Sequence, residues 1–139
     1  MQDSAENKVL AVVVMCAAAA EHIGLLWWAC YGIMQERTRP YPDDMQIGYA
    51  FAFALCLMVA LAGVCTAVLF AGIRRMLPNI WERLAWAGGA LALSPWTTLV
   101  FCLLALPLVP LTAGVSLAVG YFAGIVAPYI VLAHWLRRR

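Results

Sequence analysis

Long stretches without charge constrain this chain more than any other feature of its sequence. Residues 45–73 and 84–136 contain no Asp, Glu, Lys or Arg, and residues 9–34 contain only Glu21. About 20 apolar residues in a helix cross the roughly 30 Å of hydrocarbon in a bilayer, so runs of this length predict membrane-spanning segments. Charged residues make up 12% of the chain, against about a quarter in soluble domains, and a soluble fold is therefore excluded.

The spans are expected to be helices. Helices and closed barrels both satisfy their backbone hydrogen bonds inside lipid, but barrel strands alternate apolar and polar residues, and this sequence does not alternate. The sequence predicts an all-α integral membrane protein, a four-helix transmembrane bundle whose short connections make successive helices antiparallel neighbours. An apolar turn at residues 107–110 is expected to join the last two spans. The single predicted domain covers residues 1–139, with spans at about residues 9–34, 45–73, 81–106 and 111–136.

Lysine and arginine are divided unequally between the two ends of these spans. The predicted loop at residues 35–44 holds only Arg37 and Arg39. Short loops rich in Lys and Arg stay on the cytoplasmic side of a membrane, so the division predicts that the N-terminus and the C-terminus are both cytoplasmic. The other basic residues all lie at the opposite ends of the spans: Lys8, Arg74, Arg75, Arg83, Arg137, Arg138 and Arg139.

The N-terminal region does not have the pattern of a secretory signal peptide. Its apolar stretch is too long for a signal core, and no small-residue cleavage site follows a short one, so we expect the first helix to remain in the mature protein. Together with the charge pattern, this favours a multi-pass protein of the bacterial inner (cytoplasmic) membrane. The net charge of +2 does not indicate nucleic-acid binding, because the basic residues lie at span ends.

Glu21 and His22 are the polar exception within the first span. Glu21 follows Lys8 by 13 residues, which is about 20 Å along a helix and so close to the middle of a bilayer. A carboxylate at that depth must be paired, hydrated or protonated. One interpretation is a proton- or cation-binding carboxylate with His22 as its partner or relay. The alternatives are a satisfied polar pair that holds helices together, and a contact with a partner subunit.

Residues 20–24, with the sequence Ala-Glu-His-Ile-Gly, resemble the first-helix signature of the small multidrug resistance transporters. Those are short four-helix proteins that work as dimers and exchange protons for cationic substrates at a glutamate of the first helix. The resemblance implies a shared proton and substrate site at Glu21. It is confined to these five residues, and residues 85–98 have no equivalent of the aromatic-x-x-Trp-x-Gly stretch in the third helix of that family.

Small residues at four-residue spacing mark two faces that are expected to pack closely against other helices. Ala20 and Gly24 form one such pair in the first span, and Ser116, Gly120 and Gly124 share one face of the last span. Residues without bulk at this spacing let two helix backbones approach each other in lipid.

Pro95 and Pro128 lie inside the third and fourth predicted spans. Each removes a backbone donor and frees the carbonyl one turn earlier, so both helices are expected to kink there. Ser94, Thr97 and Thr98 lie beside the first proline, and their hydroxyls can bond to the freed groups.

The sequence offers no pattern for catalysis, and none for binding a metal or a cofactor. Its cysteines form no C-x-x-C pair. His22 and His134 are separated by roughly 15 Å along the membrane normal, too far for the two axial ligands of one haem. Ser94 and Ser116 have no suitably placed His or Asp. We therefore predict a protein that is not an enzyme on its own and that needs no cofactor.

Two functions remain open. The first is a non-catalytic subunit of a larger membrane complex, which the small extramembrane content, the apolar turn and the packing faces favour. The second is a small homo-oligomeric proton-coupled transporter or channel that uses Glu21. The expected partners are the lipid bilayer and either other membrane subunits or further copies of this chain.

Overall fold

The described part of the chain is almost entirely helical, and four of its helices are long and apolar enough to cross a membrane. The computed structural model describes residues 2–38 and 45–138. The predicted all-helical fold with four apolar spans is confirmed to this extent. In chain order the α-helices are α1 (Gln2–Thr38), α2 (Met45–Gly72), α3 (Ile80–Ala105), α4 (Val109–Thr112) and α5 (Val115–Arg137), with 3₁₀ turns at Ile73–Arg75 and Leu106–Leu108.

Helix α1 is longer than the span predicted for it. Its 37 residues extend about 55 Å, well beyond the roughly 30 Å of hydrocarbon. Residues 35–38, which were expected to begin the first loop, form its last turn. Arg39 and Arg139, which contribute to the predicted orientation, lie outside the described residues.

The connection between α3 and α5 differs from the prediction. The turn expected at residues 107–110 is instead helical, because proline is tolerated in the first turn of a helix, where its missing N–H is not needed. The chain reverses at Ala113 and Gly114, which both adopt left-handed conformations with φ of 49° and 83°. Helix α5 therefore begins at Val115 rather than near residue 111.

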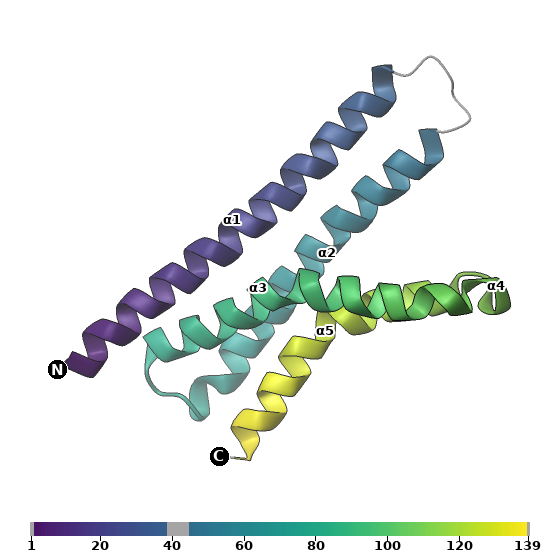
Figure 1. Cartoon of the computed structure of the whole chain (residues 1–139). Coiled ribbons are helices and arrows are strands. Elements are labelled where there is room, and N and C mark those ends of the chain that lie inside the picture. The colour runs from purple at the N-terminus through teal and green to yellow at the C-terminus, as the bar shows by residue number, and fades with distance from the viewer. Residues whose placement is uncertain (1, 39–44, 139) are drawn as a thin grey trace.

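Helix α3 lies at the centre of the arrangement. It contacts α1, α2 and α5, and α2 also contacts α1 and α5. Both termini and the α2–α3 connection lie at one end of the molecule, and from there the α1–α2 pair and the α3–α5 pair diverge (Figure 1). We call this shared end the basic end, because it carries the side chains of Lys8, Arg74, Arg75, Arg83, Arg137 and Arg138.

Helices α3 and α5 pack closely through two glycines. A Cβ atom at Gly120 would lie 2.9 Å from the carbonyl oxygen of Phe101, and one at Gly124 would lie 2.9 Å from the carbonyl oxygen of Thr97 and overlap Thr98 Cα. Ser116, one turn before Gly120 on the same face, donates a hydrogen bond of 3.3 Å to the Ala105 carbonyl. This face of α5 is thus in backbone contact with α3.

The backbone carbonyls freed by the two prolines accept hydrogen bonds from side-chain hydroxyl groups. Pro95 leaves the Leu91 carbonyl without its helical N–H, and Ser94 Oγ donates to that oxygen at 2.9 Å. Pro128 does the same to the Gly124 carbonyl, and Thr97 Oγ1 reaches across from α3 to donate to it at 2.6 Å. The second bond joins two helices, and the absence of a side chain at Gly124 allows the close approach that it needs.

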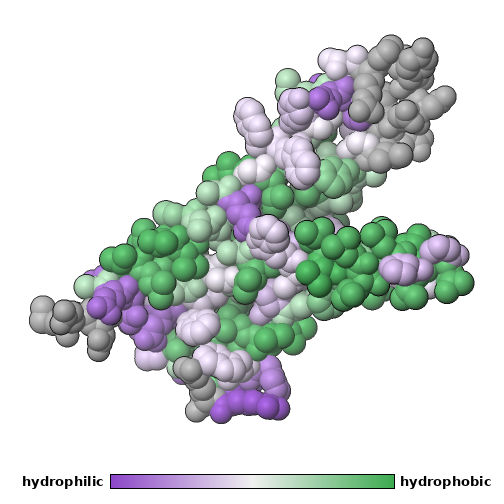
Figure 2. Space-filling model, viewed as in Figure 1, coloured by the Kyte–Doolittle hydropathy of each residue, from purple (hydrophilic) through white to green (hydrophobic). Residues whose placement is uncertain are grey.

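Tyrosine hydroxyls connect α5 to α2. Tyr129 donates to the Ala62 carbonyl at 2.9 Å, and Tyr121 donates to the Ala54 carbonyl. Around these bonds lie two apolar clusters, in which Ile125 is fully buried. Elsewhere the visible surface is largely apolar along the helices, with hydrophilic residues toward the ends and one hydrophilic patch near the middle of α1 (Figure 2). The clusters contain Leu69, Ile73, Ala90, Tyr129 and Leu136 toward the basic end, and Met58, Ala62 and Ile125 farther along.

The contact at Gly124 predicts a specific loss of stability. Gly124→Ala places a Cβ against Thr98 Cα, and overpacking of this kind costs about 1–3 kcal/mol. Gly63→Ala is the matched control, because a Cβ at Gly63 meets nothing within 4 Å and alanine favours a helix by about 0.5–1 kcal/mol. Unfolding in mixed detergent micelles, followed by circular dichroism, should show the two variants shifting in opposite directions. An equal shift in both would contradict the packing.

Candidate functional site

One face of α1 is buried against its neighbours, and this face carries His22. Residues repeated at intervals of seven lie on one side of a helix and can all face the same partner. The buried residues of α1 form two such series, one at positions 11 and 18 and the other at positions 22, 29 and 36. Because most of them are alanine, α1 lies close to the helices it contacts, α2 and α3. The buried residues of this inner face are Ala11, Ala18, His22, Ala29 and Glu36.

The hydrogen bonding of His22 leaves one ring nitrogen without a partner. Nδ1 lies 2.8 Å from the carbonyl oxygen of Ala18, one turn earlier in α1. Because a carbonyl only accepts, Nδ1 carries the proton, and Nε2 of the neutral ring is an acceptor. The side chain is only 7% exposed, and no described residue offers Nε2 a hydrogen bond. Buried polar groups are normally satisfied, so this nitrogen requires an explanation.

Glu21 lies beside this inner face and is half-buried. Adjacent residues of a helix point about 100° apart, and among the described residues no hydrogen bond joins Glu21 to His22. Glu21 instead shares a flank of α1 with Val14 and Leu25, which are also half-buried. His22 therefore lies within the contact with α2 and α3, and Glu21 lies at its edge.

A second acidic residue, Glu36, lies on the inner face two heptads after His22. Its side chain is buried and rests on Gly48 of α2, where a Cβ would come within 2.6 Å of the Glu36 carboxyl carbon. Glu36 was expected within the loop at residues 35–44, and its contact with α2 was not predicted. The available signals were the seven-residue spacing from His22 through Ala29 and a glycine near the start of the next span.

The other predicted packing pair of α1 faces away from the chain. Ala20 and Gly24 are both exposed, and a Cβ at Gly24 would meet nothing within 4 Å. The structure therefore does not use this pair to pack α1 against the described helices. His134 is exposed in the last turn of α5. Among the described residues, no group of three or more His, Cys, Asp or Glu side chains comes together.

Comparisons of the chain with protein-family models, with curated proteins and with solved structures gave no match. The resemblance of residues 20–24 to the small multidrug resistance transporters thus rests on those five residues alone. The length and composition of the four long helices indicate a multi-pass membrane protein.

The unpartnered nitrogen of His22 yields a test between a structural and a functional role. The Ala18 carbonyl already accepts the backbone N–H of residue 22 within the helix, so His22→Leu leaves no acceptor unsatisfied and removes a buried one. Because an unsatisfied buried group costs about 1–3 kcal/mol, we expect the unfolding free energy in micelles to stay equal or rise. His134→Leu, at an exposed position, controls for added hydrophobicity. A marked loss of stability specific to His22→Leu would instead show that this histidine holds the helices together.

Proposed function

We propose that this chain is a non-catalytic subunit of a larger membrane complex. The observation that carries the proposal is the outer face of α1, which is apolar, rich in small residues at its centre and exposed along its length. Four of its residues, at positions 13, 20, 24 and 31, lie two positions after residues of the inner face, about 200° around the helix. The residues of the outer face alternate at intervals of four and three: Val13, Ala17, Ala20, Gly24, Trp27, Tyr31 and Met34, all exposed.

This outer face has the features of a helix-packing surface in lipid. Small residues allow a second backbone to approach, and the intervals of four and three are those of a left-handed helix pair. Trp27, next to the small residues, is 76% exposed, and large aromatic side chains commonly anchor protein interfaces. Since only 17–22% of the most apolar window of each span is buried within the chain, most of the surface of every span is open to lipid or to another protein.

The proposed orientation has both termini in the cytoplasm of a bacterial cell, with the chain in the inner membrane. The support is the concentration of Lys and Arg at the basic end. In inverted membrane vesicles, added protease is expected to remove a C-terminal tag, and a protected tag would contradict this orientation.

The subunit role predicts that a bulky residue at Gly24 releases the partner. Gly24→Leu adds a side chain in open space, so the chain itself should fold and insert normally while its complex dissociates. Gly63→Leu, on an exposed part of α2, is the matched control. Purification in mild detergent followed by native mass spectrometry measures both. A wild-type protein that purifies only as copies of itself would refute the subunit role.

A second candidate function, a small homo-oligomeric proton-coupled transporter, is favoured by Glu21 and His22. Glu21 is a half-buried carboxylate near the middle of α1, and the Nε2 atom of the neighbouring His22 is a buried acceptor without a partner among the described residues. An ionisable residue within a span commonly marks an ion or substrate path. Here a second copy of the chain would supply the rest of the path.

Transport through Glu21 would depend on its charge. Glu21→Gln keeps the size of the side chain but cannot exchange a proton, so proton movement in proteoliposomes with an imposed pH gradient should fall to background. Glu6→Gln, at an exposed position near the basic end, removes an equal charge elsewhere on α1 and should leave transport unchanged. Equal proton flux in the wild type and in Glu21→Gln would eliminate this candidate.

A further inference from the structure

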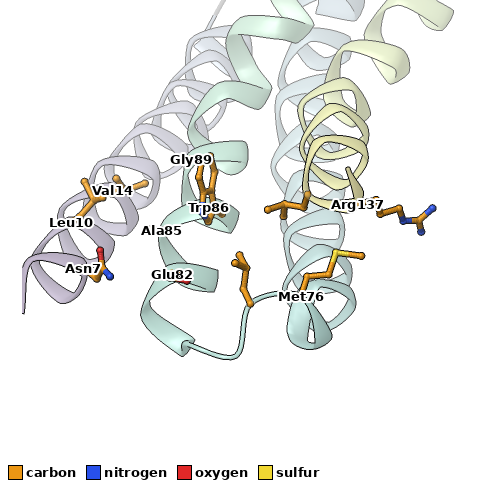
Figure 3. A pocket seen from close by; sticks show the side chains of 11 residues that line it. Asn7, Leu10, Val14, Met76, Glu82, Ala85, Trp86, Gly89 and Arg137 are labelled. Carbon is orange, nitrogen blue, oxygen red and sulfur yellow. The ribbon is translucent and has the colours of Figure 1, made fainter. Parts of the chain in front are cut away.

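A cavity of about 930 Å³ opens at the basic end between α1, α3 and the end of α5 (Figure 3). Its volume lies within the range of about 300–1,000 Å³ typical of ligand pockets. Leu10 and Val14 line one side, Trp86 and Gly89 the next, and Leu136 the far side. A Cβ at Gly89 would meet nothing within 4 Å, so the cavity extends to the backbone of α3.

The polar residues of the lining all lie toward the basic end, and the deeper part of the lining is apolar. Asn7 and Glu82 lie toward the end of the molecule, whereas Val14 and Gly89 lie seven residues farther along the same two helices, or about 10 Å deeper. Asn79 fixes the start of α3 by accepting a 3.0 Å hydrogen bond from the Trp81 N–H. A ligand that fits this order has an apolar portion inside and a polar head at the mouth.

The charged residues of the lining are Glu82 and Arg137, but basic side chains outnumber acidic ones among the described residues of this end of the molecule. Arg137 contributes to the lining, but its side chain points away from the other labelled residues (Figure 3), toward the surface. Two further cations at this end lie over aromatic rings: Lys8 Nζ is 5.9 Å from the centre of the Trp81 ring, and the guanidinium carbon of Arg83 is 4.9 Å from that of Phe70. The described acidic side chains at this end are only Glu6 and Glu82, fewer than the basic ones.

A pair of tryptophans marks the depth of the mouth relative to a membrane. Trp86 and Trp135 have ring centres 5.2 Å apart, and both are more than one-third exposed. Indole rings favour the boundary between hydrocarbon and headgroups. The mouth therefore lies where lipid phosphates are found, and the apolar part of the cavity lies where acyl chains begin.

We propose that this cavity binds one anionic phospholipid of the surrounding leaflet. One acyl chain enters between Leu10, Val14 and Gly89, and the phosphate lies on the side of Arg137, away from Glu82. Basic pockets between membrane helices on the cytoplasmic side commonly hold anionic headgroups. The helix of a partner protein would fill an apolar groove equally well, but it would not account for the polar mouth or for the surplus of cations around it. This inference does not depend on the subunit or the transport role.

The first test fills the cavity. Full-length protein reconstituted with phosphatidylglycerol and phosphatidylcholine is extracted in mild detergent, and native mass spectrometry counts the lipids that remain bound. The wild type should retain one phosphatidylglycerol, and Gly89→Leu should reduce its occupancy about tenfold without disturbing the fold, because the new side chain enters open space. Gly63→Leu should behave as the wild type. Ala85→Phe, which also lines the cavity, provides a second filling variant if the first inserts poorly.

The second test changes the charges at the mouth. Arg137→Gln should weaken phosphatidylglycerol binding about fivefold, which corresponds to the roughly 1 kcal/mol of one basic residue near an anionic headgroup. Arg37→Gln, in the last turn of α1 and far from the basic end, is the matched control. Glu82→Gln should strengthen binding, because it removes an acidic group from the mouth of the cavity.

Three results would overturn the proposal. The first is equal retention of both lipids by the wild type, which would indicate ordinary contact with the bilayer. The second is a weakening of binding by Glu82→Gln, which would indicate that a headgroup ammonium lies at this acid. The third is a Gly89→Leu variant that keeps its lipid but loses a protein partner, which would assign the cavity to a helix.

Discussion

Satisfying backbone carbonyls in a medium without water is the constraint on which this structure depends. Lipid chains are as apolar as leucine, so close packing and hydrogen bonds, rather than the hydrophobic effect, hold membrane helices together. Pro95 and Pro128 each free a carbonyl that hydrocarbon cannot satisfy. Ser94 donates a hydrogen bond to the carbonyl that Pro95 frees within α3. Thr97 of α3 donates one to the carbonyl that Pro128 frees in α5. A hydroxyl of α3 therefore satisfies a backbone carbonyl of α5, and this hydrogen bond helps to hold the two helices together.

The remaining helices are arranged around this contact. Helix α2 joins it through carbonyls that accept hydrogen bonds from tyrosines of α5, of which Tyr129 also lies 2.9 Å from the Thr66 hydroxyl. Helix α1 joins through its inner face, whose small residues let it pack closely on α2 and α3. The helix that carries Glu21 and His22 is thus held to the rest by close packing along its inner face.

Features of this structure that depend on one segment alone could be predicted from the sequence. Features that depend on how two helices align could not. Uncharged runs determine the spans, and the link between Pro95 and Ser94 follows from the geometry of a single helix. That Thr97 serves the carbonyl freed by Pro128 depends on how α3 and α5 align, which the pattern of residues does not reveal. The left-handed residues at Ala113 and Gly114 are likewise not predictable, because alanine rarely adopts this conformation and the prolines before them suggested an earlier turn.

The sequence gives the position of the candidate residues along α1 but not the direction in which their side chains point. In a soluble helix the polar face reveals the exposed side, but α1 is apolar nearly all round, so small residues occur both on the face that packs and on the face that does not. Only the structure shows that His22 points inward while Ala20 and Gly24 point outward. It also places Glu21 seven residues beyond Val14, and a heptad returns to nearly the same side of a helix. The carboxylate therefore lies on the flank of α1 that lines the cavity at the basic end, about 10 Å past its deepest residues. An acyl chain bound in that cavity would therefore lie between Glu21 and the basic end of the molecule.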